Sequence, residues 1–468
     1  MSRFPLLARV ARPLTGFIAA GFTVGGASIG GFILGGFVLA GLVACGGASP
    51  DSPSDNGQVL PSEEEARQIE ETTESGNPSL DELRALPYAG YSRTAAENPE
   101  QKGVSALDRE ASAAGYNLTT FRSLCSAELL TPTGHALRAW SGGEECRHWA
   151  NSRLLPNGDL LVIGMNHPEP GQRPFDARFI ARFDWSGELL FQHFLPVHHD
   201  AAPGPGESLF VLAAGYLESE GDGRTEERLA GEGLQAETST IYDNYLLRIA
   251  PDGEILDRIS LFDAVHAGPF PFTPQPVPPK KNQDGILAVD LFHCNAVVWN
   301  PAHTPSLDGV GAAAEDTVLL TSRHQDSVFL IDWRRGQLLW AWGQGVLSGP
   351  HDASWLPDGK MLVFDNGIER GWSRPLELDP QDGSISWSWS ADEPENFYTL
   401  SRGSAQRLPN GNTLMAESDA GRALEVTRDG EIAWEYFSPY LDERDRRATI
   451  VRMRRHPPEL VDALRTAP

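Results

Sequence analysis

Six segments of the chain alternate apolar and polar residues on both sides of a short turn that contains glycine. Alternation with a period of two around an Asp-Gly-type turn is typical of a β-hairpin. The predicted hairpins cover residues 127–141, 181–193, 246–260, 328–342, 375–390 and 423–437. Their turn glycines are Gly134, Gly187, Gly253, Gly336, Gly383 and Gly430, and the last three are 47 residues apart. This period, with four short strands in each unit, predicts a β-propeller.

A second repeated element lies between the hairpins and predicts two more strands in each unit. Its clearest copies contain Leu-Pro-x-Gly, and the looser copies keep only the apolar pattern. The copies cover residues 151–164, 198–214, 293–300, 351–367 and 403–417. Six hairpins and five such pairs leave one blade a strand short, so we expect residues 448–454 to join the first hairpin and close the ring. This closure removes the exposed strand edges that would otherwise aggregate. The fold class is therefore all-β, a six-bladed β-propeller over residues 81–468.

The N-terminal segment differs from the propeller in composition. Arg3, Arg9 and Arg12 precede an uncharged run over residues 14–44, which ends at Leu42-Val43-Ala44-Cys45. This pattern is typical of a lipoprotein signal peptide over residues 1–45, with Cys45 as the lipidated residue. The alternative is a transmembrane anchor, because the run is long enough to cross a bilayer of about 30 Å.

Residues 46–80 are rich in Ser, Pro, Gly and Glu and predict a disordered acidic linker. We therefore expect a propeller that is held to a membrane through a lipid anchor at Cys45. Gly46 after the cysteine favours the outer membrane, with the protein in the cell envelope and facing the periplasm.

Charge and cysteine content narrow the possible functions. The net charge is -26, which makes nucleic-acid binding improbable because phosphate contacts need a basic surface. Cys125 and Cys146 flank the first predicted hairpin and could pair in an oxidising compartment, whereas Cys294 would remain free and buried. The Cys and His spacings match no zinc motif, so we expect no metal site.

Histidines recur at matching positions of the second repeated element. The innermost strands of a propeller face one axis, so equivalent positions in successive repeats converge. His199, His293 and His351 lie at corresponding strand starts, and His148 lies on the same strand face in its own repeat. We expect them to share one pocket. For the histidines without a matching repeat position we expect ordinary surface or core roles: His135, His167, His193, His266, His303 and His456.

Four stretches together resemble the arylsulfotransferase family of PAPS-independent bacterial sulfotransferases. They are FHCNAVVWN, LLTSRHQDSVFLID, PHDASWLPDGKMLVFDNG and NFYTLSRGSAQRLPNGNTLMAES, and the resemblance runs from about Lys102 to Arg454. The resemblance implies a six-bladed propeller that moves a sulfuryl group from a phenolic sulfate ester to a phenolic acceptor. It also implies a sulfohistidine intermediate, ping-pong kinetics, no cofactor and no metal.

Roles for individual residues are carried over by motif. The resemblance implies that His351 is the nucleophile and that His293, Asn295 and Arg323 hold the sulfuryl oxygens. It makes His199 the second imidazole beside the transferred group. Sulfuryl transfer places charge on the equatorial oxygens and on the departing phenolate, which suits these donors.

Further residues near the motifs are less specific. Phe397 and Tyr398 could stack on a phenol ring. Asp365 and Asn366 read as turn formers, although Asn366 could line the channel. Arg323 could alternatively bridge blades through Asp326 or Asp352. Gly403 stands where well-characterised members of the family carry a threonine, which puts the substrate range in doubt.

Two other functions remain open from the sequence. The first is a non-catalytic propeller that binds a ligand or partner at the cell envelope, which Gly403 favours. The second is a calcium-dependent hydrolase such as a lactonase, but it would need carboxylates on the axis where this chain has histidines.

Overall fold

The structure is a computed structural model that describes residues 89–217, 240–281, 287–307 and 311–466. The chain divides into two units, Met1–Ile69 and Glu70–Pro468, and the description concerns the second. The expected signal peptide and the expected linker therefore lie outside the described residues. Among the described residues, no helix has both the length and the apolar character needed to span a bilayer.

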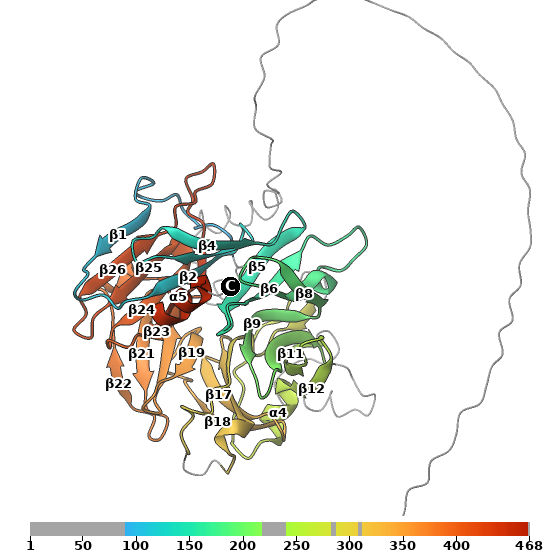
Figure 1. The fold of residues 1–468 in the computed structure, drawn as a ribbon. Helices are drawn as coiled ribbons and strands as arrows, with labels where there is room; N and C mark the ends of the chain where they lie inside the picture. The colour runs from blue at the N-terminus through green and yellow to red at the C-terminus, as the bar shows by residue number, and fades with distance from the viewer. Residues whose placement is uncertain (1–88, 218–239, 282–286, 308–310, 467–468) are drawn as a thin grey trace, which may run out of the picture. The chain divides into compact units, whose positions relative to one another are not determined.

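Six sheets, each built on antiparallel strands, surround a common axis, which confirms the six-bladed β-propeller (Figure 1). The first blade contains β2 (Tyr116–Phe121), β3 (Ser126–Leu130) and β4 (Ala136–Ser141), and the second contains β5 (Cys146–Leu154), β6 (Leu160–Asn166), β7 (Arg178–Phe183) and β8 (Leu189–Phe194). The third blade contains β9 (Val197–Pro203), β10 (Leu209–Tyr216), β11 (Thr240–Ile249) and β12 (Ile255–Ser260). The fourth contains β15 (Cys294–Val298), β16 (Thr317–Ser322), β17 (Ser327–Asp332) and β18 (Gln337–Trp342). The last two blades are β19 (His351–Trp355), β20 (Met361–Asp365), β21 (Arg374–Leu378) and β22 (Ile385–Ser388); and β23 (Ser404–Arg407), β24 (Thr413–Glu417), β25 (Arg422–Val426) and β26 (Ile432–Phe437). All six predicted hairpins are present.

The C-terminal strand closes the ring as the sequence predicts. Strand β27 (Ile450–His456) pairs with β2 and becomes the innermost strand of the first blade. The six inner strands β5, β9, β15, β19, β23 and β27 contact one another in that order and return to β5. Side chains at the start of each inner strand are therefore brought to one end of the axis.

Apolar side chains fill the spaces between neighbouring blades. Each of the six core clusters combines residues of two adjacent blades; one of them joins Phe121 and Leu130 of the first blade to Leu414 and Trp434 of the last. The tryptophans that recur on the outer strands also join blades, because their indole N–H groups reach the next hairpin turn. Trp434 donates to Pro132 O at 2.9 Å, and Trp140 donates to Asp184 O at 3.0 Å.

Several elements add to the basic blade plan. Strand β1 (Gly103–Leu107) pairs with β26 as a fifth strand of the last blade. In the third blade, β13 (Lys280–Lys281) and β14 (Leu287–Val289) extend the sheet beyond β11. Within the described ranges, the helices are α4 (Leu261–Ala267), α5 (Pro458–Thr466) and four 3-10 turns at Pro174–Ala177, Ala314–Asp316, Pro394–Asn396 and Ser418–Ala420.

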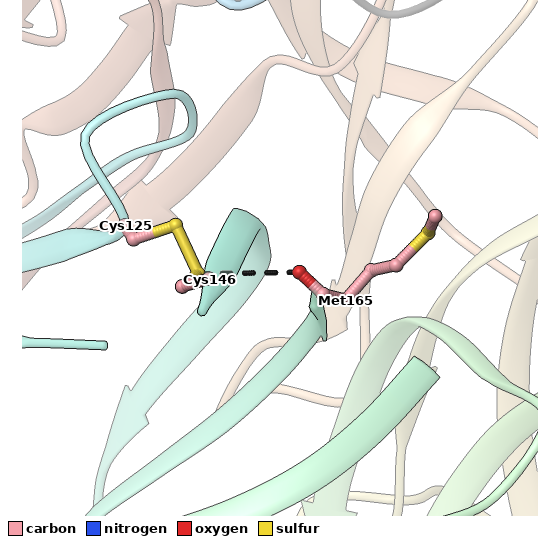
Figure 2. Close-up of a disulfide and its surroundings, with 3 residues drawn as sticks. All are labelled: Cys125, Cys146 and Met165. Atoms are coloured by element: carbon pink, nitrogen blue, oxygen red, sulfur yellow. Dashed lines mark hydrogen bonds between the residues drawn. A yellow bond between two sulfur atoms is a disulfide. The ribbon is translucent and has the colours of Figure 1, made fainter. Parts of the chain in front are cut away.

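A disulfide joins the first two blades. Cys125, between β2 and β3, is bonded to Cys146 at the start of β5, so the pairing that the sequence left open is present (Figure 2). Cys294 is free and buried, as expected. The bridge fixes the beginning of β5, the inner strand of the second blade, beside the site described next.

Candidate active site

A small polar cavity lies where the inner strands meet. It is lined by Ala150, Asn151, His199, Asn295, His351, Asp352, Arg402, Gly403, Val451 and Arg452, which come from all six inner strands or the residues just before them. Its volume of about 20 Å³ has room for roughly one water-sized group. A phenol ring bound here would therefore lie outside the cavity, with only a small group reaching inside.

Unusual backbone conformations recur around this cavity. His199, His293, Asp352 and Arg402 all have positive φ, between 47° and 61°, at or just before the start of an inner strand. The strand registers of β9, β15 and β19 shift at the same places. Non-glycine residues in this region carry a cost of about 1–3 kcal/mol each, and such costs gather at functional sites. The bulges turn the first residues of β9, β15 and β19 toward the axis.

The hydrogen bonds of His351 fix its tautomer. Asn366 Nδ2 donates to Thr399 O at 2.8 Å and to Arg402 O at 2.7 Å, so Asn366 Oδ1 must be the atom that faces His351 Nδ1, at 2.7 Å. His351 Nδ1 also lies 3.1 Å from Gly349 O. Two oxygen acceptors require that Nδ1 carries the proton. The lone pair is therefore on Nε2, which accepts the Arg402 backbone N–H at 3.1 Å.

Three imidazole rings pack in a row beside His351. The rings of His199 and His293 lie 4.9 Å apart between centroids, and those of His293 and His324 lie 4.6 Å apart. His293 Nδ1 lies 2.5 Å from Asp290 Oδ2. His293 does not itself line the cavity, but it contacts His199, which does.

Burial keeps most of these rings neutral. Burial holds the pKa of His351 well below its usual value, and the charge of Arg323 lowers it further. Burial, with the neighbouring imidazoles, does the same for the pKa of His199, and burial lowers the pKa of His324 to about 3. His351 can thus offer an uncharged nitrogen lone pair at neutral pH. Burial alone would raise the pKa of Asp290, but the adjacent His293 and His324 outweigh it and lower that pKa.

Arginines make the surroundings of these rings positive although the whole chain is acidic. Arg323 Nη1 lies 3.2 Å from His324 Nε2, and the charge of Arg323 acts on His351. Arg122 acts on both His148 and His199. Arg402 lines the cavity and pairs with Asp419 at 2.8 Å. A site of this kind favours an anion over a cation.

One set of side chains in the described part of the chain has a spacing that could hold a metal ion. Asp290, His293 and His324 each offer an atom within 4.8 Å of the others. Their contacts are hydrogen bonds, and the guanidinium of Arg323 beside His324 Nε2 would repel a cation. The arrangement is better suited to holding protons than to holding a metal.

A network of ion pairs forms the floor of the cavity and joins the inner strands. Arg452 of β27 lies between two carboxylates, 3.1 Å from Asp200 of β9 and 3.2 Å from Asp352 of β19. Arg454 of β27 also pairs with Asp352, at 2.5 Å. Asn151 of β5 donates to Asp200 at 2.7 Å. These contacts hold the inner strands in register and neutralise the carboxylates beneath the cavity.

Most of the residues proposed from the sequence come together, and three do not line the cavity. His199, His351 and Asn295 line the cavity, with His293 and Arg323 next to them. His148 is on β5, but the bulges of that strand bring Ala150 and Asn151 to the cavity in its place. Phe397 is fully buried against Phe364 and Trp389, so it is a core residue and not a contact for a phenol ring.

Tyr398 is half-buried and does not line the cavity. Burial raises the pKa of its hydroxyl, with a further contribution from Asp419, while Arg93 and Arg323 act in the opposite direction. Tyr398 thus lies among charged groups that include Arg323, outside the cavity.

Gly403 is required by the local geometry. Its φ is +98°, and a Cβ at this position would lie 2.2 Å from the Phe364 ring. The adjacent Arg402 N–H donates to His351 Nε2, and Gly403 N–H donates to Ser418 Oγ at 2.9 Å. The glycine therefore accompanies a backbone donor at the place where the resemblance implies a threonine side chain.

Three residues of the site were not foreseen in these roles. Asn366 sets the tautomer of His351, whereas the sequence suggested a turn former that could line the channel. Asp290 holds His293, and its only sequence signal is a carboxylate three residues before that histidine. Arg402 acts through its backbone N–H, which no sequence pattern reveals.

Comparison with known proteins identifies the family. The family pattern described as Arylsulfotransferase (ASST) matches residues 198–438. No curated protein sequence matches the chain. This match covers more than half of the chain and contains His199, His293, Arg323 and His351.

Similar solved structures include a protein of unknown function from Bacteroides caccae, with 12% identity, a TM-score of 0.43, and coverage of 73% of this chain and 98% of that one. Another is a streptogramin B lyase, with 10% identity, a TM-score of 0.40, and coverage of 77% and 96%. A third is a virginiamycin B lyase from Staphylococcus aureus, with 11% identity, a TM-score of 0.36, and coverage of 71% and 87%. At these TM-scores the likenesses carry no argument about function. The family match and the propeller together show that the chain belongs to the arylsulfotransferase family.

Proposed function

We propose that this protein is a PAPS-independent aryl-sulfate sulfotransferase that moves a sulfuryl group from a phenolic sulfate ester to a phenolic acceptor. The observation that carries the proposal is the state of His351. It is a buried, neutral imidazole whose lone pair is on Nε2, in a cavity lined by His199 and Asn295. A neutral nitrogen nucleophile among cationic and hydrogen-bonding groups suits attack on a sulfate ester.

In the first half-reaction, His351 Nε2 attacks the sulfur of the donor. An N–S bond forms, the S–O bond to the phenol breaks, and the electron pair leaves with the phenolate oxygen. The Nδ1 proton of His351 stays hydrogen-bonded to Asn366 Oδ1. The Arg402 N–H that now faces Nε2 is released by this attack and becomes available to donate to a sulfuryl oxygen.

In the second half-reaction, the hydroxyl oxygen of the acceptor attacks the same sulfur. The N–S bond breaks, its electron pair returns to His351 Nε2, and the acceptor gives up its proton to a nearby base. Dividing the transfer at a covalent intermediate replaces one difficult step with two easier ones. The expected kinetics are ping-pong.

A coupled release assay tests the proposal. The protein with 4-nitrophenyl sulfate and phenol should release 4-nitrophenol, and His351→Gln should reduce this release by a factor on the order of 10⁴ or more, by analogy with the loss of other nucleophiles. His193→Gln is a matched control, because His193 lies on the outer strand β8, away from the cavity. Release that His351→Gln leaves unchanged would contradict the proposal.

A non-catalytic binding propeller is the second candidate, and two observations favour it. The cavity is small, and His351 Nε2 already accepts a hydrogen bond from Arg402. Intact-mass measurement after exposure to the donor separates the two candidates, because a binding protein would stay unmodified.

We further propose that the protein is lipid-anchored at Cys45 in the cell envelope, on the outer membrane and facing the periplasm. The lipobox-like Leu42-Val43-Ala44-Cys45 supports lipidation of Cys45. The disulfide of the propeller supports an oxidising compartment. Mass spectrometry of the mature N-terminus should find an acylated Cys45. An unmodified N-terminus, or one that retains residues 1–44, would contradict this proposal.

A further inference from the structure

A chain of hydrogen bonds connects Asp290 to both His293 and Arg323. The carboxylate of Asp290 accepts from His293 Nδ1 at 2.5 Å and from the His293 backbone N–H at 3.2 Å. The carbonyl oxygen of Asp290 accepts from His324 Nδ1 at 2.6 Å. His324 Nε2 then lies 3.2 Å from Arg323 Nη1. Asp290 thus orients the imidazole of His293 through its carboxylate. Through its backbone carbonyl and His324, it also orients the guanidinium of Arg323.

The loop that carries Asp290 is held firmly between β14 and β15. Leu291 and Phe292 are fully buried in the core between the third and fourth blades. Gln325 Nε2 donates to Leu291 O at 2.6 Å, and Ser322 Oγ donates to Phe292 O at 2.6 Å. The spacing between Asp290 and His293 is therefore set by the blade core and does not depend on a bound ligand.

The contact with Asp290 determines which nitrogen of His293 can exchange a proton with a substrate. A carboxylate only accepts hydrogen bonds, so Nδ1 of His293 carries a proton and Nε2 is the atom that can gain or lose one. Of the three packed rings, burial holds the pKa of His199 and of His324 well below the usual value.

We propose that Asp290 is a positioning residue that keeps His293 ready to protonate the departing phenolate oxygen. The inference rests on the proposed sulfotransferase function and assigns a proton path within it. As the S–O bond of the donor breaks, the electron pair goes to the phenolate oxygen, and the proton on His293 Nε2 moves to that oxygen. In the second half-reaction the proton of the acceptor hydroxyl returns to His293 Nε2, so protons balance over one cycle.

The test compares two donors that differ in how much their leaving group needs a proton. Asp290→Asn removes the charge but keeps the shape and the backbone carbonyl that holds His324. We expect kcat/KM for phenyl sulfate, which in a ping-pong reaction reports the first half-reaction alone, to fall about 10²-fold or more, the usual effect of losing general acid catalysis. With 4-nitrophenyl sulfate, whose phenolate is a good leaving group, the fall should be much smaller. KM for both donors should stay close to the wild-type value because the Arg323 contact remains.

Asp257→Asn is the matched control, since Asp257 lies on the outer strand β12, outside the site, and pairs there with Arg248 of β11. It should leave both donors unaffected. An equal loss of kcat/KM for both donors in Asp290→Asn would show a merely structural role and overturn the inference alone. Wild-type protein that releases neither phenol overturns the proposed function, and the inference with it.

A spectroscopic measurement covers the case in which Asp290→Asn does not fold. Proton NMR of the wild-type protein with 15N-labelled histidine should show a strongly deshielded Nδ1 proton that is missing from His293→Gln. A wild-type spectrum without such a proton would contradict the pairing of Asp290 with His293.

Discussion

The side-chain amide of Asn366 fixes which nitrogen of His351 carries the proton, and two backbone carbonyl groups fix the orientation of that amide. Asn366 can present only its oxygen to His351, because its nitrogen is occupied by Thr399 O and Arg402 O. The nucleophilic nitrogen is therefore chosen before a substrate arrives. Because burial and Arg323 also hold the pKa of His351 low, the lone pair on Nε2 persists in mild acid.

This state predicts an unusual pH profile for the reaction. An imidazole with an ordinary pKa of about 6.5 would lose about tenfold in its neutral form between pH 7.5 and 5.5. We expect kcat/KM for 4-nitrophenyl sulfate to show no such loss over this range. Samples should be quenched into alkali before 4-nitrophenol is read, because the colour itself depends on pH. A decline with a midpoint near 6.5 would contradict a buried neutral His351.

At the same scale, the sequence predicted the histidines but not the groups that control them. His199, His293 and His351 could be found because they recur at equivalent repeat positions. Asn366 and Asp290 could not, since their roles depend on which atom of a side chain faces a neighbour. Phe397 was expected at the site, yet an aromatic residue beside a strand is as easily taken into the core.

At the scale of the element, the starts of the inner strands carry the residues of the site. The alternating pattern of the hairpins was enough to predict every outer strand pair. It could not predict that His199, His293, Asp352 and Arg402 adopt left-handed backbone conformations, because non-glycine residues seldom do so. Strand β1 was also missed, since it is short and pairs with β26 far along the chain.

Replacing the glycine before β23 tests whether a family-like threonine is tolerated in this backbone. In Gly403→Thr, the added Cβ would overlap the Phe364 ring at a φ of +98°. We expect a loss of stability well above the 1–3 kcal/mol that backbone strain alone costs, and lower activity because the Arg402 N–H would move away from His351. Thermal unfolding and the nitrophenol assay measure both effects.

The matched control for this substitution is Gly411→Thr. Gly411 has a similar φ of +92°, but an added Cβ there would meet nothing within 4 Å. It should show only the backbone cost and keep its activity. If Gly403→Thr were as stable as Gly411→Thr, the account of Gly403 as a geometric requirement would be wrong.

For the whole molecule, the closed ring of blades buries histidines that its unfolded chain would expose. Ring closure was predictable, because six hairpins and five inner pairs left one strand position vacant and the C-terminal segment fitted it. Burial is the first cause of a lowered pKa at each of these histidines: His148, His198, His199, His324, His351 and His456. The values for His198 and His456 fall to about 3 and about 4.

These shifts predict that the fold weakens in mild acid. Below about pH 6.5 the unfolded chain takes up protons that the folded protein does not, so stability falls as the pH falls and is fully present above pH 7. Each such histidine contributes about 1.4 kcal/mol per pH unit. Asp243, whose pKa burial raises to about 7, acts in the opposite direction and offsets roughly one histidine.

Thermal unfolding at pH 7.5, 6.0 and 5.0, at constant ionic strength, measures this effect. We expect the midpoint to fall steadily from pH 6 to 5, and His456→Gln should make the dependence shallower by about one proton. His456 suits this comparison because it lies at the end of β27, outside the cavity. A midpoint that stays constant over this range would show that the histidines are not buried in neutral form.

The central claim is that a covalent intermediate forms on one imidazole at the axis of the propeller. The most direct measurement is peptide mass spectrometry of the wild-type protein quenched in alkali after exposure to 4-nitrophenyl sulfate without an acceptor. The account predicts one added sulfuryl group on the peptide that contains His351, and its loss when phenol is added before the quench. Release of 4-nitrophenol with an unmodified His351, or a sulfuryl group on another residue, would contradict it.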